Sequence, residues 1–588
     1  MIIQSLHRYY DRKRESGELA PEGFERRSIP FVVVLAADGT LVQIEDTRSG
    51  TGKQRVAREF VVPQSVKRSA DIAANLLWDT AEYALGIDTR GKADRVAKQH
   101  ADFVARVQNL AGYVDDDGLR AVIRFLSHSN TKLLAADPTF AELAENNAVI
   151  AFRLTGDPGN LVCERGDVVR AIRESVNHGN NEDQSFCAVL GRADRTARVH
   201  SAIKGVWGAQ SSGANIVSFN LDAFESFGRK QGANAPIGTE AAFTYTTALN
   251  HLLRKGSPQR MQVGDASTVF WSAVPTPLED DFAAIFGSTL SDDPDRGTQA
   301  VRNLYAAVKN GVYVPDIGRN TEFCVLGLSP NAARIAVRFW HRTTVAELAP
   351  AIVQHLRDVE IDHPDYLAEH LSMFALLNAT ALLGRSENVP PKLAGEVFRS
   401  ALTGQPYPAA LLQAAVRRLR AERDVGYPRA AVIKACLNRT IRHGHLDAKE
   451  LHVSLDPDNT DPGYRLGRLF AALERIQAAA QPGINATIRD RYYGAASSSP
   501  SSVFPVLLRL KNHHLGKLDN PRLAGWFEKT LADIFAGIES FPTHLSLPLQ
   551  GMFAVGYYHQ QQAFFTRRID PTATDNLQPS ASNQEPTP

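Results

Sequence analysis

The secondary structure that the sequence favours changes near Pro390. Beyond this point strand signals nearly vanish and apolar residues recur at helical spacing in segment after segment. In YRLGRLFAALERIQAAA, one apolar stripe consists of Leu466, Leu469, Phe470, Leu473 and Ile476. The same stretch carries Arg465, Arg468 and Arg475 off that stripe, which favours a basic exterior. We therefore predict a helical bundle over residues 391–569.

The sequence before Pro390 mixes strand and helix patterns. Residues 29–35 (IPFVVVL) are typical of a buried strand, Asp38-Gly39 of a tight turn and residues 41–45 of an alternating strand, which together predict a hairpin. A helix capped by Ser69 is predicted over residues 71–86, where Gly86 ends it, and further strands at 149–154 and 321–340.

These patterns predict an α+β fold: a mixed N-terminal region with small sheets over residues 1–390, followed by an all-α C-terminal bundle over 391–569. The first region has room for two subdomains, with a break between 235 and 300. Residues 570–588 are rich in Ser, Thr, Pro and Asn, and predict a disordered tail.

Several classes of protein do not fit this sequence. No apolar run approaches the roughly 18 residues of a membrane span, and the charged start MIIQSLHRYYDRKRE is unlike a signal peptide. The cysteines are scattered without a paired motif: Cys163, Cys187, Cys324 and Cys436. We expect a cytoplasmic protein without membrane, disulfide framework or zinc site.

A net charge of +1 hides an uneven distribution of charge. Residues 392–569 carry 23 Lys and Arg against 14 Asp and Glu, whereas residues 1–391 carry 42 against 47. The basic C-terminal third favours a polyanionic partner, and a solvated surface is the alternative explanation of the same counts.

The segment 198–228 is unlike its surroundings. Gly205, Gly208 and Gly213 interrupt a run of polar residues that also holds one large aromatic residue, Trp207. Its other members are Lys204, Gln210, Ser211, Ser212 and Asn215, and a β-rich run at 216–219 follows. Glycines let a backbone approach a ligand, and these side chains suit a phosphate or a base edge. The alternative is a structural turn with a core tryptophan.

A second candidate, residues 53–68, is strongly basic. Its cations flank a strand-like run at 60–62: Lys53, Arg55, Arg58, Lys67 and Arg68, with Glu59 as the one acid. Such a pattern can follow a nucleic-acid backbone, and a hydrated loop explains it equally well.

Motifs of catalysis are missing from the sequence. It has no HExxH, no GxSxG, no paired-cysteine metal site and no adjacent His-Asp dyad. His513 and His514 are neighbours, but adjacent helical residues point about 100° apart and are poorly placed to share a metal. We expect no enzyme activity, no catalytic residue, no metal and no cofactor.

At the run IKGVWGAQSSGANIVSFN the chain resembles a known family, the large subunit of the type I-C CRISPR interference complex Cascade (the Dvulg subtype). The resemblance covers the chain from its first residues and includes IPFVVVLAADGTLVQIEDTR, AFTYTTALNHLL and YRLGRLFAALERIQ. The resemblance continues through VPQSVKRSADIAANLLWD, LGLSPNAARIAVRFW, PGINATIRDRYYGAAS and FAVGYYHQQQAFF, and extends to about Arg568. It implies a non-catalytic subunit that recognises the protospacer-adjacent motif, aids duplex opening, stabilises the R-loop and supports recruitment of a helicase-nuclease. The C-terminal bundle would resemble the Cascade small subunit.

The implied partners are the guide RNA-containing Cascade complex with its backbone and guide-end subunits, target double-stranded DNA and the helicase-nuclease. We expect the motif to be read by Lys204, Gln210, Ser211, Ser212 and Asn215, with Trp207 as wedge or support. Duplex phosphates would be held by Lys53, Arg55, Arg58, Lys67 and Arg68, and the displaced strand by Arg465, Arg468, Arg489, Arg491 and Lys511. Two alternatives are a structural bridging subunit that reads no DNA, and a nuclease or RNA-processing subunit.

Overall fold

The protein is described by a computed structural model, which covers residues 1–50, 55–66, 72–88, 91–128, 134–177, 184–287, 296–310 and 321–566. Contacts divide the chain into two compact units. Unit 1 comprises Met1–Ala202 and Val217–Asn250, and unit 2 comprises Ile203–Ile216 and the chain from His251 onward. The short segment 203–216 therefore belongs to a different unit from the residues on both sides of it. The predicted tail 570–588 lies outside the described residues.

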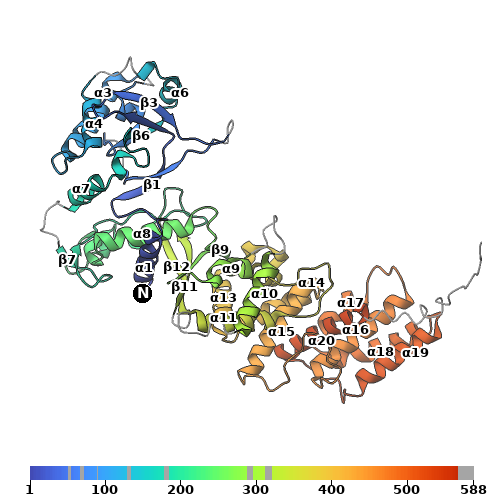
Figure 1. Ribbon diagram of the computed structural model, residues 1–588. Helices are drawn as coiled ribbons and strands as arrows, with labels where there is room; N and C mark the ends of the chain where they lie inside the picture. Colours follow the sequence, from blue (N-terminus) through green and yellow to red (C-terminus); the bar gives the residue numbers. More distant parts are fainter. Residues whose placement is uncertain are drawn as a thin grey trace, which may run out of the picture. The chain divides into compact units, whose positions relative to one another are not determined.

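Unit 1 is built on a four-stranded sheet in the order β3-β2-β6-β5 (Figure 1). The central strand β2 (Phe31–Leu35) is buried along its whole length. It pairs antiparallel with β3 (Leu41–Asp46) and parallel with β6 (Val149–Leu154), which in turn pairs with β5 (Trp78–Thr80). The predicted hairpin is confirmed: Gly39 turns with a φ of +88°, and Asp38 Oδ1 accepts a hydrogen bond of 2.9 Å from the Thr40 amide.

Further elements surround this sheet. A separate antiparallel pair is formed by β1 (Phe24–Ser28) and β4 (Glu59–Pro63), and another by β7 (Gln184–Phe186) and β8 (Ala193–Arg195). The helices are α1 (Ile2–Glu15), α2 (Ala81–Ala84), α3 (Ala93–Leu110), α4 (Asp117–Leu126), α6 (Phe140–Glu145), α7 (Gly166–Asn177) and α8 (Thr239–Leu253). Within the unit, Tyr10 of α1 packs edge-on against Phe243 of α8 at 5.8 Å between ring centroids.

The helix predicted over residues 71–86 is wrong for residues 72–80, and only Ala81–Ala84 are helical in the described part of this stretch. Leu77 has a φ of +63°, which no α-helix tolerates, and the chain then enters β5 before the single turn of α2. Trp78 pairs with Ala151 of β6, and its indole nitrogen donates a 2.7 Å hydrogen bond to the Pro63 carbonyl. Sheet pairing and one buried indole therefore override the helical spacing of the apolar residues. Ser69 lies outside the described residues.

Unit 2 begins with an antiparallel four-stranded sheet in the order β12-β11-β10-β9. Its strands are β9 (Arg260–Val263), β10 (Ala266–Ser272), β11 (Glu322–Asn331) and β12 (Arg334–Thr344). Every residue of β10 is buried. Helix α9 (Pro277–Phe286) packs on this sheet through Phe282, whose ring centroid lies 4.6 Å from that of Phe270.

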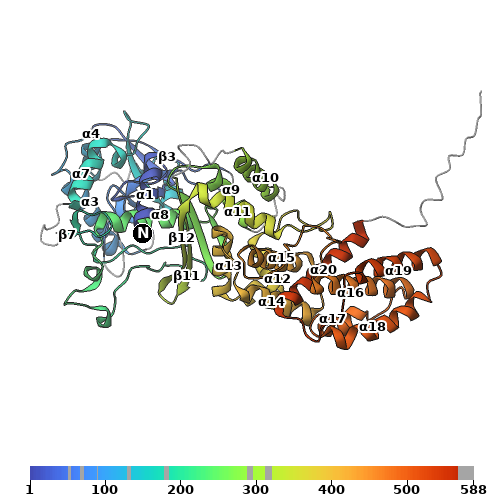
Figure 2. The same ribbon diagram turned by 90° about the horizontal axis from the view of Figure 1, so that it is seen from below.

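All-helical structure follows β12, as the sequence predicts, so the fold is α+β (Figure 2). After α10 (Arg296–Lys309), which precedes β11, the helices are α11 (Val345–Val359), α12 (Met373–Thr380), α13 (Pro391–Thr403), α14 (Ala409–Glu422), α15 (Tyr427–Arg442), α16 (Pro462–Ala480), α17 (Ile488–Ala496), α18 (Pro500–Leu515), α19 (Pro521–Phe535) and α20 (Leu547–Thr566). None of the described helices is both long and apolar enough to cross a membrane.

The close pair α16–α20 holds the far part of the bundle together. Its contact depends on small residues, because a Cβ on Gly467 would lie 2.0 Å from the Phe553 carbonyl oxygen, and one on Gly556 would lie 2.1 Å from that of Tyr464. The two backbones therefore touch. Because α16 also contacts α17, α18 and α19, it is buried on almost all sides rather than along one stripe.

A buried ion pair joins α11 to α15. Arg439 and Asp358 are almost completely buried, and the Nε of Arg439 donates to Oδ2 of Asp358 at 2.6 Å. Arg442 lies 3.0 Å from the other carboxylate oxygen, and the Arg439 guanidinium stacks 4.3 Å from the Tyr407 ring centroid. Because both carboxylate oxygens are paired, the charge of Asp358 is accommodated inside the bundle.

Candidate nucleic-acid interface

The two ends of the segment 203–216 pair with each other, and the Asn215 end also pairs with the unit 2 sheet. Ile203 and Ala214, both buried, exchange two backbone hydrogen bonds of 2.9 Å. Beside this pair, the Ile335 amide at the start of β12 donates to the Asn215 carbonyl at 3.0 Å. The segment is therefore a closed loop with a fixed base.

Glycines set the shape of this loop. Gly205 has a φ of +87°, and a Cβ there would lie 2.5 Å from the Leu253 carbonyl oxygen, so only glycine fits. Gly208, with a φ of +77°, closes a turn in which the Ala209 amide donates to the Val206 carbonyl at 3.1 Å. A second turn ends at Gly213, whose amide donates to the Gln210 carbonyl at 2.9 Å.

The loop displays the side chains that the sequence singled out. Lys204, Trp207, Gln210, Ser211 and Ser212 are exposed. The ring of Trp207 is 64% exposed, so the alternative of a core tryptophan is wrong. Its backbone is nevertheless fixed, because its amide donates at 2.9 Å to the hydroxyl of Ser267, a fully buried residue of β10.

Two features of the segment differ from expectation. Asn215 is half-buried at the base of the loop, where its backbone forms a parallel β-bridge with Arg334. It therefore lies apart from the exposed tip. The β-rich run 216–219 forms no strand. Lys204 and Asn215 have further interactions inside the protein, which leaves Gln210, Ser211 and Ser212 as the polar groups at the tip.

This geometry can present hydrogen-bonding groups to a large ligand. An amide side chain both donates and accepts, as does a serine hydroxyl, and an exposed indole offers a flat face. A base edge needs such matched donors and acceptors on a support that does not rearrange. The loop has both the hydrogen-bonding groups and the fixed support, whereas a solvated linker would have only the hydrogen-bonding groups.

The basic segment near residue 60 is less open than its sequence indicates. Arg55 and Arg58 are exposed, while Lys53, Lys67 and Arg68 lie outside the described residues. The Arg55 guanidinium lies 3.7 Å from Asp46 and 3.8 Å from Glu142. Arg48, which the sequence analysis did not single out, binds the same two acids at 2.8 and 2.6 Å. Its hydrogen bond is the main cause that lowers the pKa of each carboxyl group, so both acids stay charged and oppose the cation field.

Arg465 and Arg468 do not lie on a basic exterior, so this part of the expectation is wrong. They are 7% and 5% exposed. Arg465 donates to the carbonyls of Asp533 and Ile534 at the last turn of α19, at 3.5 and 3.3 Å. Arg468 donates to Gln560 at 3.1 Å, and burial lowers the pKa of its guanidinium. Both arginines join helices together.

The other three bundle residues lie nearer the solvent. Arg491 is exposed and Lys511 is half-buried. Arg489 is half-buried, with its Nε 3.6 Å from a carboxylate oxygen of Glu474. The five predicted residues therefore do not form one surface.

Four exposed cations on α18, on α19 and on the connection between them escaped the sequence analysis. They are Arg509, Lys517, Arg522 and Lys529. None of the four forms an ion pair with another described residue. In the sequence, the three of them that lie in helices are marked only by their position off the apolar stripe of an amphipathic helix. The same pattern led to the wrong prediction that Arg465 is exposed.

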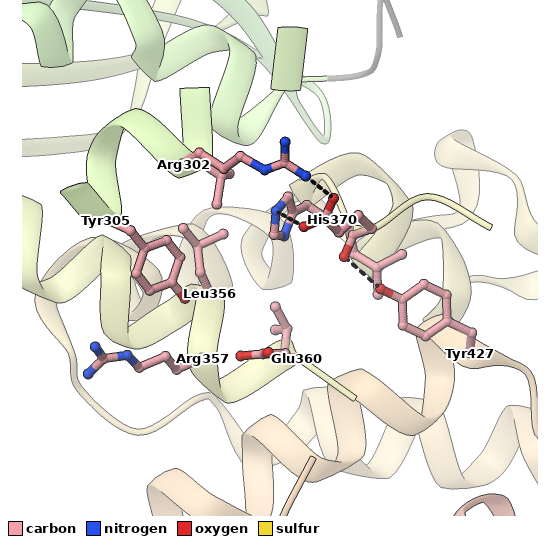
Figure 3. A pocket seen from close by; sticks show the side chains of 11 residues that line it. Arg302, Tyr305, Leu356, Arg357, Glu360, His370 and Tyr427 are labelled. Atoms are coloured by element: carbon pink, nitrogen blue, oxygen red, sulfur yellow. Dashed lines mark hydrogen bonds and ion pairs between the residues drawn. The ribbon is translucent and has the colours of Figure 1, made fainter. Parts of the chain in front are cut away.

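A cavity of about 380 Å³ lies between α10, α11 and the start of α15 (Figure 3). Its polar groups largely satisfy one another: Arg302 binds Glu369 at 3.1 Å, and the Tyr427 hydroxyl donates to the Glu369 carbonyl at 3.4 Å. Arg357 stacks 5.7 Å from the ring centroid of Tyr305. The cavity brings no nucleophile next to a general base.

Other reactive groups are buried or dispersed. All four cysteines are buried, and burial raises the pKa of the Cys436 thiol to about 12. Within the described part of the chain, no three His, Cys, Asp or Glu side chains gather as a metal site would require.

Comparison with known proteins relates the chain to a protein family. A family model described as CRISPR-associated protein (Cas_Csd1) matches residues 6–565, nearly the whole chain. No curated protein matches the sequence. This match agrees with the resemblance carried by the loop segment and by further stretches along the chain, and it shows the family. The chain belongs to the Cas_Csd1 family of CRISPR-associated proteins.

Proposed function

We propose that this chain is the non-catalytic large subunit of a type I-C RNA-guided interference complex. In this role it recognises the motif beside the target, helps to open the duplex, stabilises the R-loop and supports recruitment of a helicase-nuclease. Family membership makes it a CRISPR-associated, Cascade-type subunit. The division of labour follows from physics: base pairing with the guide reads a long sequence, and a protein needs to read only a few base pairs.

The loop 203–216 is the observation that carries this proposal. Its exposed tip residues are Gln210, Ser211 and Ser212. The backbone beneath them is held by the hydrogen-bonded pair Ile203–Ala214, by two turns and by a hydrogen bond to the buried Ser267. Matched donors and acceptors on a fixed support are what direct readout of a base edge requires. Trp207 adds a stacking face beside them, and Lys204 adds a cation.

The other roles are assigned to surfaces that the described residues expose. Arg58, which is exposed, is assigned to duplex phosphates, whereas Arg55 stands beside two acids. For the displaced strand, the exposed cations of α18 and α19 replace Arg465 and Arg468 in the assignment, and Arg491 stays with them. Phosphate contacts of this kind position a nucleic acid without reading its sequence.

The test is duplex binding by the complex reconstituted with and without this chain, on targets with one protospacer and a randomised flanking motif at fixed salt. Discrimination between motifs is expected to disappear when the chain is omitted. If discrimination persists, the chain does not read the motif, and a bridging subunit explains its place in the complex.

Single substitutions then localise the reading. Gln210→Ala and Ser212→Ala are expected to weaken binding to the preferred motif by about 1–3 kcal/mol per lost base contact, and to leave other motifs unaffected. Gln299→Ala, at an exposed glutamine of α10 in the same unit, is the matched control and should bind as the unmodified complex does. Unchanged motif preference in both loop variants would make the loop structural.

A further inference from the structure

The cavity of about 380 Å³ in unit 2 has an apolar interior and a charged rim (Figure 3). Its interior is formed by side chains that are all buried: Val301, Leu356, Val359 and Leu371. The arginines and glutamates of the lining are exposed instead. A ligand that fills this cavity therefore needs an apolar part that enters it and a charged part that stays at the rim.

The charges of the rim are not all paired. Arg302 binds the Glu369 carboxylate at 3.1 Å, so these two charges compensate each other. Arg357 has no carboxylate partner, but its guanidinium lies 5.7 Å from the Tyr305 ring centroid and extends away from Glu360 (Figure 3). No described residue forms an ion pair or a side-chain hydrogen bond with Glu360. The carboxylate of Glu360 is therefore the charge that the cavity offers to a ligand.

The end of α11 adds to the negative field at this point. Glu360 directly follows the last residue of the helix, and its amide donates to the Leu356 carbonyl at 3.0 Å. The C-terminal end of a helix carries a partial negative charge, which favours a cation nearby. Lys434 donates to the carbonyls of Arg357 and Asp358 at 3.3 and 3.0 Å and offsets part of this field, but it does not pair with Glu360.

Two tyrosine rings, Tyr305 and Tyr427, lie on opposite sides of the cavity (Figure 3). The ring of Tyr427 is fixed, because its hydroxyl donates to the Glu369 carbonyl at 3.4 Å and the His363 ring stacks on it at 4.5 Å between centroids. Aromatic faces attract organic cations and also pack against the methylene groups beside the charge. A ring that is ordered before binding lowers the entropic cost of the complex.

We propose that this cavity binds an alkylammonium group, whose ammonium pairs with Glu360 while its alkyl chain lies between the two tyrosines on the apolar interior. A free alkylamine and the lysine side chain of a partner subunit both supply this chemistry. An uncharged ligand would cover Glu360 without a partner, and an anion would be repelled by it. The inference goes beyond the proposed function, because none of these residues belongs to the surfaces assigned to DNA.

Isothermal titration calorimetry of the full chain with pentylamine tests this inference. Saturable binding is expected. Pentanol, which has the same alkyl chain without the charge, should bind at least tenfold more weakly, because it cannot form the charge-assisted hydrogen bond to the carboxylate. Nα-acetyl-lysine amide, which represents the protein-borne source, should bind in competition with pentylamine.

Variants of the chain assign the binding to the cavity. Glu360→Gln keeps the shape of the side chain and removes its charge, so it should weaken pentylamine binding about tenfold and leave pentanol binding as it was. Tyr305→Leu keeps an apolar side chain without the ring, and about a threefold loss is expected for pentylamine. Glu539→Gln, at another exposed carboxylate of unit 2, is the matched control and should bind as the unmodified chain does.

The assembled complex distinguishes the two sources of the ammonium group, and either result supports the inference. If the ligand is a free amine, the complex binds pentylamine as the isolated chain does. If a partner's lysine occupies the cavity, pentylamine binds the isolated chain but not the complex, and Glu360→Gln weakens assembly.

Three outcomes would overturn the inference: no saturable binding of pentylamine or the lysine amide to the isolated chain, equal binding of pentylamine and pentanol, or unchanged pentylamine binding in Glu360→Gln. None of them affects motif discrimination, on which the proposed function depends.

Discussion

At the scale of single residues, the bundle buries two histidines in their neutral form. His355 accepts or donates a 2.5 Å hydrogen bond with the Tyr407 hydroxyl, and burial lowers its pKa to about 3, with the Arg439 guanidinium as the second cause and Asp358 opposing. His559 pairs with the Tyr464 hydroxyl at 2.9 Å, and burial again lowers its pKa to about 3.

These two groups make the stability of unit 2 depend on pH. In an unfolded chain a histidine takes up a proton near pH 6.5, whereas in the folded unit it does so only near pH 3. Between these values the unfolded state binds more protons, so the free energy of unfolding falls as pH decreases. Each histidine contributes a slope of about 1.4 kcal/mol per pH unit in the steep part of this window. The full contribution is present above pH 6.5.

Urea unfolding followed by tryptophan fluorescence between pH 7 and pH 4.5 measures this slope. The signal reports mainly on unit 2, which contains Trp207, Trp271, Trp340 and Trp526. His355→Gln and His559→Gln keep a neutral hydrogen-bonding group, and each is expected to flatten the pH dependence by one histidine's share. An unchanged slope in both variants would contradict neutral burial, whatever their absolute stability.

At the scale of elements, the contact between α16 and α20 is the tightest part of the bundle. Gly467→Ala places a methyl group 2.0 Å from a backbone carbonyl that cannot move without displacing α20. We expect a loss of about 3 kcal/mol in the free energy of unfolding, the upper part of the range for overpacking. Gly556→Ala should act in the same way from the other helix.

Thermal unfolding by circular dichroism tests this contact, with Gly525→Ala as the matched control. Gly525 lies in α19, where an added Cβ would meet nothing within 4 Å. Its replacement should stabilise the helix slightly, because alanine is a better helix former than glycine by about 1 kcal/mol. If Gly467→Ala unfolds at the same temperature as the unmodified chain, the two helices are not in backbone contact.

Elements with a strong local signal were predictable from the sequence. The hairpin of β2 and β3 has an Asp-Gly turn between two strand patterns, and the bundle helices have long apolar stripes, so local preference and tertiary structure agree. The helix predicted over residues 71–86 was wrong because helical spacing there competes with sheet pairing at Trp78, a long-range contact that no local pattern records.

The candidate interface shows the same limit. For the loop 203–216 the sequence left two interpretations open, an exposed polar tip and a structural turn with a core tryptophan, and the exposure of Trp207 decides between them. Its anchors could not be predicted, because Ser267, Leu253 and Ile335 come from distant parts of the sequence. For α16, a single apolar stripe implies one buried face, but contact with several helices buries Arg465 and Arg468 as well.

At the scale of the whole molecule, the surplus of basic residues in the C-terminal third is divided between the protein interior and the surface. Part of it is internal, since Arg429, Lys434, Arg439, Arg465 and Arg468 are buried. These charges stabilise helix contacts and are unavailable to a polyanion. The field that a nucleic acid would meet comes from the exposed remainder, so a formal charge of +9 overstates it.

Salt dependence separates the two groups of cations. Arg522 and Lys529 lie seven residues apart on α19 and so share one face of that helix. Replacing both by glutamine in the reconstituted complex is expected to reduce the slope of log affinity for single-stranded DNA against log salt by about 1.4, at about 0.7 for each lost phosphate contact. Arg95→Gln with Lys98→Gln, two exposed cations of α3 in unit 1, is the matched control and should leave the slope unchanged.

The buried group should behave differently. Arg465→Gln should lower the unfolding temperature, because it leaves the last carbonyls of α19 without their donor, and the slope of log affinity against log salt should stay as it was. If the α19 variant alters assembly of the complex but not the slope, this surface contacts a protein subunit, and the bridging explanation of the bundle would be correct.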